Sequence, residues 1–274
     1  MDDLDARLAA LDHALRGLGG VLVAFSGGAD SALLLAAAVR ALGPDHVVAA
    51  TAVSPSLAAA ELPAARDYAA GLGVRHVVPG TDELARPGYV ANGADRCFHC
   101  KATLLDTLRP LAASLGLAHV ATGTNADDAV AGFRPGIRAA AERGALTPLL
   151  DAGLSKAQVR EASRRWGLPT AGKPALACLA SRIAYGVQVT PSRLARVDRA
   201  ETALRTHLAA AGVPPVDLRV RDLGDGAARV ELDPAALARC DEGALDVVRS
   251  EGFGEVVAAQ FASGSLNRAL APGA

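Results

Sequence analysis

Hydrophobic residues along the first half of the chain follow two different patterns. Steps of three and four positions are typical of one face of a helix, and short unbroken apolar runs are typical of buried strands. The predicted strands cover residues 21–25, 47–53, 74–78 and 118–122. The predicted helices cover residues 2–18, the stretch from the first loop to Leu42, and residues 57–72 and 101–115, with a loop at 79–95. Strands that alternate with helices predict an α/β fold with a doubly wound parallel sheet.

The pattern changes in the second half of the chain. Residues 155–166 are predicted to form a helix capped by Ser155, and residues 173–182 are predicted to be irregular because no single period fits them. From about Thr190 the spacing predicts helices at 197–211 and 234–250 and strands at 216–222, 228–232 and 255–259. The tail after Ser263 is expected to fray. The sequence therefore predicts a first domain at residues 1–188 and a smaller C-terminal α+β domain at residues 189–274.

A Ser-Gly-Gly-Ala-Asp-Ser turn at residues 26–31 joins the first strand to its helix. Two glycines at a helix start let backbone N–H groups converge on an anion such as phosphate, although a tight turn that caps a crossover helix has the same composition. The P-loop lysine and the dinucleotide Gly-x-Gly-x-x-Gly pattern are both missing. Ligands of a doubly wound sheet bind outside the carboxyl ends of its strands. The loops at 26–31, 54–56 and 123–128 are therefore expected to face one crevice.

Composition narrows the class of protein. The chain has 274 residues, 51% of them hydrophobic, and a net charge of −1, so it lacks the basic balance of a dedicated nucleic-acid binder. The acidic N-terminus has no signal pattern and the apolar runs are too short for a bilayer, which predicts a cytoplasmic protein without a membrane partner. Four cysteines in such a chain do not indicate a disulfide framework. One of them, Cys240, is expected to be a buried core residue of the last predicted helix.

The other three cysteines could carry chemistry. Cys97 and Cys100 have metal-ligand spacing just before a predicted helix, and no second pair exists to complete a zinc site. Cys178 lies in the irregular segment near Lys173 and Arg182, whose charges favour a thiolate. Three thiolates can hold three irons of a 4Fe-4S cluster and leave the fourth iron open. Alternatively, Cys97 and Cys100 form an incidental or redox-labile pair and Cys178 acts alone as a nucleophile or sulfur donor.

The 26–31 loop resembles the pyrophosphate loop of the ATP pyrophosphatases. Together with the 123–128 turn, the Phe133-Arg134-Pro135-Gly136 element and residues 178–186, it makes nearly the whole chain similar to the LarE family. The resemblance implies an adenine nucleotide alpha hydrolase-like (PP-loop) fold. It also implies thiolation of pyridinium-3,5-dicarboxylic acid mononucleotide, on the way to the nickel-pincer cofactor of lactate racemase. In the family, ATP adenylates a substrate carboxylate, and sulfur then displaces AMP.

The resemblance also implies roles for single residues. The pyrophosphate is expected at the loop residues Ser26, Gly27, Gly28, Asp30 and Ser31. Asp30, Ser31 and Cys178 are the expected catalytic residues, with Mg²⁺ on Asp30 and with Thr124 and Asp127 completing the ATP site. One family subgroup consumes the sulfur of a single cysteine at the position of Cys178, and another has three cysteines and a 4Fe-4S cluster. This chain resembles the second subgroup, with Cys97, Cys100 and Cys178 as cluster ligands.

Arg219 and Arg221 alternate with apolar residues along a predicted strand, so both point to one face. An ordinary solvated face has the same pattern, but arginine also suits the phosphate and carboxylates of a mononucleotide substrate. The resemblance implies that these arginines, with Glu201 and Glu231, lie near a phosphate- or metal-binding site. It further implies a homo-oligomer, because the family forms hexamers.

Three other functions fit parts of the sequence. A tRNA thiolase can combine this loop with a three-cysteine cluster, but its basic patches are missing from this near-neutral chain. An amidating enzyme of the NAD-synthetase kind would use ammonia and would not need the cysteines. A nucleotide-binding regulatory module would use its cysteines to sense redox state, without turnover of ATP.

Overall fold

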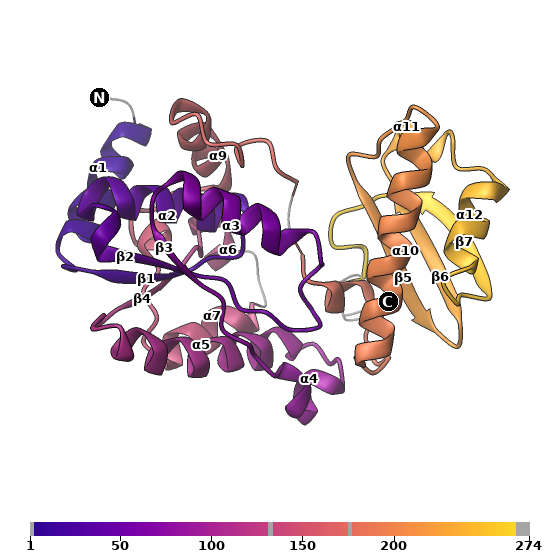
Figure 1. Cartoon of the computed structure of the whole chain (residues 1–274), viewed down its shortest axis with the longest axis horizontal. Coiled ribbons are helices and arrows are strands. Elements are labelled where there is room, and N and C mark those ends of the chain that lie inside the picture. The colour runs from indigo at the N-terminus through magenta and orange to yellow at the C-terminus, as the bar shows by residue number, and fades with distance from the viewer. Residues whose placement is uncertain (1–2, 131–133, 175–176, 267–274) are drawn as a thin grey trace. The chain divides into compact units, whose positions relative to one another are not determined.

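The computed structural model describes residues 3–130, 134–174 and 177–266, which form two compact units (Figure 1). Unit 1 comprises Met1–Ser54, Ala59–Glu83 and Cys97–Leu176, and unit 2 comprises Pro55–Ala58, Leu84–Arg96 and Ala177–Ala274. The predicted boundary between residues 188 and 189 stays a prediction. Phe133 and residues 267–274, which include most of the tail expected to fray, lie outside the described residues.

Unit 1 is built on a four-stranded parallel sheet. Its strands are β1 (Val21–Ala24), β2 (Val47–Ala50), β3 (Arg75–Val77) and β4 (Val120–Thr122), in the order β3-β2-β1-β4. β1, β2 and β4 are apolar along almost their whole length because helices cover both faces of the sheet. The chain leaves β1 toward β2 on one side and reaches β4 on the other, so the sheet is doubly wound. The predicted α/β class is confirmed.

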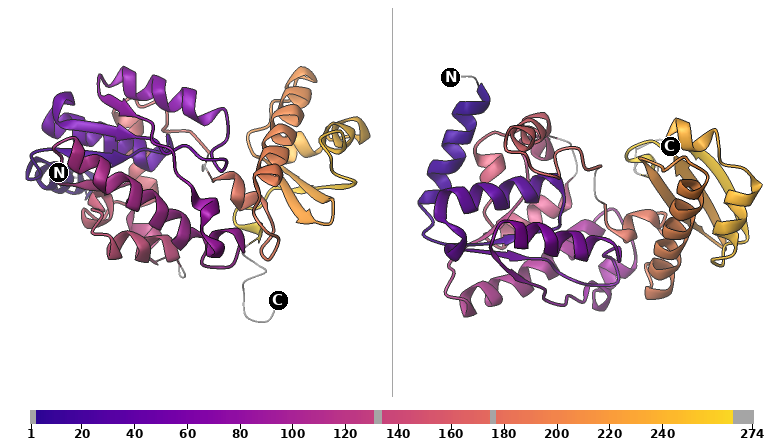
Figure 2. Two further views of the ribbon diagram at one scale, coloured as in Figure 1. Left: turned by 60° about the horizontal axis from the view of Figure 1, so that its bottom comes forward. Right: turned by 45° about the horizontal axis from the view of Figure 1, so that its top comes forward.

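Two apolar cores flank this sheet, one on each face. On one face α1 (Asp3–Arg16), α2 (Ala29–Leu42), α3 (Glu61–Gly71) and α9 (Lys156–Arg165) pack against the sheet, and on the other α5 (Arg96–Ser114) and α7 (Pro135–Glu142) do so (Figures 1 and 2). Ser155 caps α9 through a capping box with Gln158, as predicted. The short helices α6 (Ala126–Val130) and α8 (Pro148–Asp151) complete unit 1. Among the described residues, no helix combines the length and apolarity needed to cross a membrane.

Unit 2 contains a smaller, mixed sheet. Its strands are β5 (Leu218–Gly224), β6 (Ala227–Leu232) and β7 (Glu255–Gln260); β5 and β6 are antiparallel, and β6 and β7 are parallel. The helices are α4 (Pro87–Val90), α10 (Pro191–Ala210), α11 (Pro234–Leu237) and α12 (Glu242–Arg249). α10 buries Leu194, Val197, Leu204 and Leu208 in this unit. The predicted smaller α+β part is therefore present.

The helix boundaries differ most from the prediction in three places. α5 starts at Arg96 instead of residue 101, so Cys97 and Cys100 lie inside the helix and not ahead of it. α10 starts at Pro191, because Thr190 caps it and proline suits the first helical position. The predicted 234–250 helix is broken into α11 and α12, because Asp241 accepts a hydrogen bond from Ala244 N–H and starts a new helix. Cys240 therefore lies half-buried in the break and not within a helix.

Two predicted loops contain short helices. The 79–95 segment holds a 3-10 turn (Glu83–Ala85) and α4, whose first residue is Pro87. The 123–128 turn runs into α6, because Asn125 accepts hydrogen bonds from the N–H groups of Asp127 and Asp128. In the segment predicted to be irregular, residues 175 and 176 lie outside the described part, and Leu179–Arg182 forms a 3-10 turn, η3.

Candidate functional site

The loop between β1 and α2 closes on itself through two serines. Ser31 Oγ accepts a hydrogen bond from Ser26 N–H at 3.3 Å and donates to the Gly28 carbonyl at 3.1 Å, and the two hydroxyl oxygens lie 3.2 Å apart. Gly27 has φ 75°, a backbone conformation that favours glycine. No described side chain caps α2 at Gly28, so the first-turn N–H groups of a 14-residue helix face this loop without a side-chain acceptor. These features suit an anion.

The turn after β4 contacts the start of α2 directly. A Cβ atom added at Gly123 would lie 2.8 Å from Ser31 N and 3.0 Å from the Asp30 carbonyl carbon, closer than real side chains come. Only glycine therefore fits at this position without a backbone shift. The 26–31 loop and the 123–128 turn, which were expected to share one crevice, are thus in contact, whereas residues 54–56 are divided between the two units.

Asp30 is held by residues from two other segments. Asn125 Nδ2 donates to Asp30 Oδ1 at 3.1 Å, and the Lys156 ammonium forms an ion pair with Asp30 Oδ2. The Lys156 N–H group donates to Asp127 Oδ2 at 2.9 Å, so the start of α9 is attached to the same turn. The hydroxyl of Thr124 lies 3.3 Å from that of Thr122. Ser26, Gly27, Gly28, Asp30, Ser31, Thr124 and Asp127 are thus all in unit 1.

Sequence reasoning missed two lysines at this loop. Lys156 was given no role, and Lys173 was noted only as a neighbour of Cys178 in the sequence. Lys173 Nζ donates to the Gly27 carbonyl at 3.2 Å and to Glu61 Oε2 at 2.9 Å. Both lysines lie more than a hundred residues from their partners in the sequence, so spacing gave no signal for these contacts.

The carboxyl ends of β1, β2 and β3 are joined by a chain of hydrogen bonds. Thr51 Oγ donates to the Phe25 carbonyl at 2.7 Å and lies 2.8 Å from His76 Nε2. Because the hydroxyl hydrogen is used on the carbonyl, His76 must be the donor in the second bond. Burial, aided by the Arg66 charge, lowers the pKa of His76. The imidazole is therefore neutral at pH 7, and this edge carries polar groups without an added charge.

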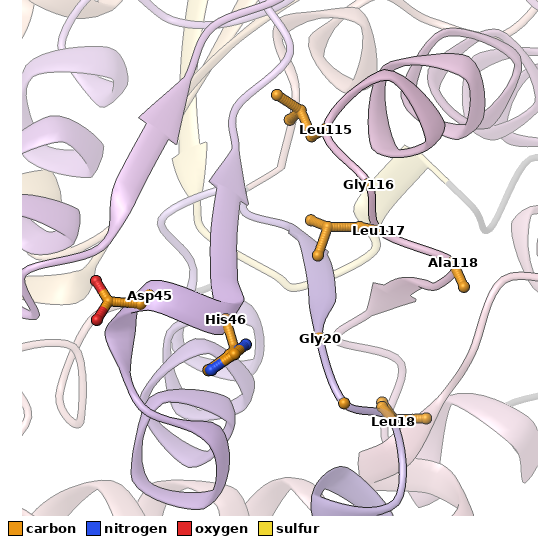
Figure 3. Close-up of a pocket in the computed structure, with 9 residues that line it drawn as sticks. Leu18, Gly20, Asp45, His46, Leu115, Gly116, Leu117 and Ala118 are labelled. Carbon is orange, nitrogen blue, oxygen red and sulfur yellow. The ribbon is translucent and has the colours of Figure 1, made fainter.

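A cavity of about 340 Å³ lies at the amino-terminal ends of the strands (Figure 3). It is lined by residues that precede β1 and β2, such as Gly20 and His46, and by Leu117 after α5. The 26–31 loop follows β1, so this cavity is at the opposite end of the strand from the candidate anion site.

Cys97 and Cys100 lie on the first turn of α5, in unit 1. Cys97 is exposed and Cys100 is half-buried, and residues three apart share one face of a helix. Burial lowers the pKa of the neighbouring Lys101 ammonium, while Cys100, Asp128 and Cys97 oppose that shift.

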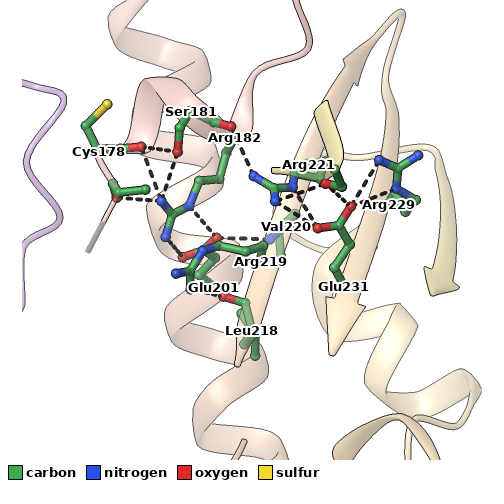
Figure 4. A network of polar contacts seen from close by, with 12 residues as sticks. Cys178, Ser181, Arg182, Glu201, Leu218, Arg219, Val220, Arg221, Arg229 and Glu231 are labelled. Carbon is green, nitrogen blue, oxygen red and sulfur yellow. Dashed lines mark hydrogen bonds and ion pairs between the residues drawn. The ribbon is translucent and has the colours of Figure 1, made fainter. Parts of the chain in front are cut away.

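Cys178 lies in unit 2, immediately before η3, with an exposed thiol (Figure 4). Its carbonyl accepts hydrogen bonds from Ser181 Oγ at 2.7 Å, Ser181 N–H at 2.9 Å and Arg182 Nη1 at 3.2 Å. Arg182 is itself buried and paired with Glu201 at 2.9 Å. The backbone of Cys178 is therefore fixed while its side chain stays accessible.

The predicted arginine face is present in unit 2, and it is largely neutralised. Leu218 and Val220 are fully buried on one side of β5, as predicted. On the other side Arg221 is paired with Glu231 at 2.8 Å (Figure 4), and Glu231 is also paired with Arg229 at 3.0 Å.

The two predicted acidic metal ligands have arginine partners. Glu201 accepts from both Arg182 and the Val220 N–H group, and Glu231 lies between two guanidinium groups. Burial lowers the pKa of Arg219, with the nearby Arg182 charge acting in the same direction. Within the described ranges, no group of three or more His, Cys, Asp and Glu side chains is placed to hold a metal ion. The metal roles of Glu201, Glu231 and the cysteines stay predictions.

Acid should destabilise unit 2 through its buried carboxylates. Burial would raise the pKa of Asp222, but hydrogen bonds from Arg196, Gly224 and Arg193 outweigh it and hold that pKa below its ordinary value. On acidification, Asp222 takes up its proton at a higher pH in the unfolded chain than in the folded chain. The contribution of Asp222 to the free energy of unfolding is therefore present above about pH 4, and it is lost as the pH falls through the lower pKa of the folded chain. Urea unfolding between about pH 6 and 3 should show this loss. Asp222→Asn should make it shallower, and an unchanged slope would contradict the assignment.

The parallel sheet with its Ser-Gly-Gly-x-Asp-Ser loop at a helix start defines a PP-loop α/β protein. The chain is 36% identical over 239 residues to pyridinium-3,5-bisthiocarboxylic acid mononucleotide synthase of Lactiplantibacillus plantarum, covering 86% of this chain and 83% of that protein. It is 40% identical over 274 residues to an uncharacterized protein of Synechocystis sp., covering 97% and 99% of the two chains. No family model matches the chain. The chain belongs to the LarE family.

Proposed function

We propose that this protein is an ATP- and Mg²⁺-dependent sulfurtransferase that acts on pyridinium-3,5-dicarboxylic acid mononucleotide. The observation that carries the proposal is the closed 26–31 loop at the start of α2, with Asp30 held by Asn125 and Lys156. It occurs in a chain similar to a synthase of the bisthiocarboxylic acid mononucleotide. A loop for pyrophosphate is what an adenylating enzyme needs, because pyrophosphate is the first leaving group.

In the first step a substrate carboxylate oxygen attacks the α-phosphorus of ATP. The bond to the bridging oxygen breaks, and the electron pair leaves with pyrophosphate. The first-turn N–H groups of α2 and the hydroxyls of Ser26 and Ser31 would bind that charge, and Asp30 would hold Mg²⁺ through its carboxylate. Thr124 and Asp127 would complete the nucleotide site on the adjoining turn.

In the second step a sulfur nucleophile attacks the activated carbonyl carbon. A carbon–sulfur bond forms, the carbon–oxygen bond to AMP breaks, and the product is a thiocarboxylate. With sulfide as the nucleophile, this exchange forms the thiocarboxylate directly. With the exposed thiol of Cys178 as the nucleophile, attack first forms a thioester; loss of the Cys178 α-proton then breaks its Cβ–S bond, which releases the thiocarboxylate and leaves dehydroalanine. Hydrogen bonds from Ser181 and Arg182 would hold the Cys178 backbone in place.

The three cysteines also supply the type of ligand that an iron–sulfur cluster needs. Cys97 and Cys100 share a helix face beside Lys101, and soft thiolates suit iron. A 4Fe-4S cluster held by Cys97, Cys100 and Cys178 would supply the sulfur at an iron that has no protein ligand. The three thiols are divided between the two units, so the cluster remains a proposal.

The remaining predictions are part of the same proposal. Arg219, Arg221, Glu201 and Glu231 would lie at a phosphate- or metal-binding site for the mononucleotide. The predictions also include a cytoplasmic location, and a homo-oligomer, which the family likeness implies.

Pyrophosphate release tests this function. With ATP, Mg²⁺ and the dicarboxylate mononucleotide, the wild-type protein should release pyrophosphate and AMP only when the mononucleotide is present. Asp30→Asn should slow the release at least about tenfold, because it removes the proposed Mg²⁺ ligand. Asp12→Asn, which breaks an exposed ion pair on α1, is the matched control. The absence of pyrophosphate release from wild type would overturn the proposal.

A further inference from the structure

Lys173 is held rigidly beside the 26–31 loop, within unit 1. Its Nζ donates to the Gly27 carbonyl at 3.2 Å and to Glu61 Oε2 at 2.9 Å. Its own N–H group donates to the Thr170 carbonyl at 3.1 Å, and its carbonyl accepts from Arg160 Nη2 at 2.8 Å. The lysine is thus anchored at its backbone and at its ammonium group.

The contact with Gly27 has a consequence for the next residue. A trans peptide is planar, and its C=O and N–H groups point in opposite directions. Because Lys173 attracts the Gly27 carbonyl to one side, the Gly28 N–H group faces the other side, where Ser26 Oγ lies at 3.4 Å. That bond is long and therefore weak, so a stronger acceptor such as a phosphate oxygen can replace it.

Glycine at both positions leaves this peptide with little orientation preference of its own. Gly27 has φ 75°, a conformation that glycine exchanges readily for others. A peptide flip would present the carbonyl to the anion and repel it. An external group that fixes the plane therefore determines whether the loop attracts or repels phosphate.

Helix α3 supplies the support for the lysine. Glu61 and Ala65 lie one turn apart and share a face, and the Ala65 Cβ is 3.7 Å from where a Gly27 Cβ would be. The side chains of Lys173 and Glu61 are exposed to similar degrees, 24% and 22%. The pair is therefore partly shielded from solvent, and α3 contacts the loop directly.

We propose that Lys173, held by Glu61, is a positioning residue that fixes the Gly27–Gly28 peptide with its N–H group toward the pyrophosphate of ATP. The inference rests on the proposed function, because it takes the 26–31 loop as the pyrophosphate site. It adds a role for two residues outside that loop. The lysine acts through the backbone and keeps its carboxylate partner when nucleotide binds.

Calorimetric titration of the full chain tests this role with two probes. They are α,β-methylene-ATP with Mg²⁺, which cannot release pyrophosphate, and AMP, which lacks the two outer phosphates. Lys173→Met should weaken the analogue about tenfold and leave AMP unchanged, because a hydrogen bond to a charged group is lost only for the outer phosphates. Arg16→Met removes one charge from an exposed pair on α1 and should bind both probes like wild type.

Glu61→Gln separates positioning from direct phosphate binding, and it remains informative if Lys173→Met fails to fold. A positioning lysine loses its support, so the analogue should bind several-fold more weakly. A lysine that leaves Glu61 to contact phosphate would lose a competitor, and tighter binding would overturn the inference. Unchanged analogue affinity in both variants would overturn it as well, with the proposed function intact. Failure of wild type to bind the analogue would overturn both.

Discussion

Replacing Cys178 by alanine is expected to abolish the thiolated product while pyrophosphate release continues. The two steps use different parts of the chain: the activating loop is in unit 1, and Cys178 is in unit 2 with its thiol exposed. Removal of the thiol leaves Ser26, Asp30 and Ser31 unchanged. Product measured by mass spectrometry should fall to the detection limit, and pyrophosphate release should stay within about threefold of wild type.

Cys240→Ala is the matched control in the same unit. Cys240 is half-buried, and burial together with Asp241 and Glu242 raises the pKa of its thiol, so it is protonated and unreactive at pH 7. This variant should form product like wild type. Product formation by Cys178→Ala would remove Cys178 from the proposed sulfur chemistry.

Iron content distinguishes a cluster ligand from a consumed sulfur donor. Under anaerobic preparation, Cys97→Ala and Cys178→Ala should both lose iron and acid-labile sulfide, because each variant removes one of three ligands. Iron retained unchanged in both variants would contradict the three-thiolate cluster and leave Cys178 as a donor of its own sulfur.

Replacing Asp222 by alanine is expected to lower the free energy of unfolding by about 3 kcal/mol, because breaking a buried ion pair leaves its partners uncompensated. Asp222 is fully buried and accepts from Arg193 and Arg196, each at 2.7 Å. Both arginines are partly exposed, so water recovers some of the loss and the lower end of the usual range applies. Urea unfolding followed by circular dichroism measures the change.

Asp246→Ala provides the comparison on α12. Asp246 pairs with Arg249, but its side chain is 69% exposed, and exposed pairs contribute at most about 1 kcal/mol. If both variants unfold with the same free energy, Asp222 does not support unit 2 in the way that its burial indicates.

The sequence predicted the sheet well because buried strands and helix caps are local signals. The strands at 21–25 and 47–53 are found as β1 and β2, and Ser155 starts α9 through its capping box. The predicted helix boundaries were wrong where a capping residue interrupts an apolar pattern. Asp241 interrupts the predicted 234–250 helix, and no hydrophobic period could reveal this break.

The candidate site was only partly predictable for a similar reason. The 26–31 loop has a recognisable sequence motif, so the turn between the first strand and its helix could be predicted. Lys156 and Lys173 come to that loop from distant segments, and only the folded chain brings them there. The buried pairing of Glu231 with Arg221 likewise depends on the register between β5 and β6, which spacing within one strand does not determine.

The close approach at Gly123 couples the position of the 123–128 turn to that of the 26–31 loop. Because there is no room for a methyl group between Gly123 and the first turn of α2, movement of either segment toward the other is opposed by contact between their backbones. A rearrangement that starts at Asp127 or Asn125 is therefore transmitted to Ser31 by repulsion between backbones and needs no intervening side chain. The two segments can approach this closely only because Gly123 carries a hydrogen atom in place of a side chain.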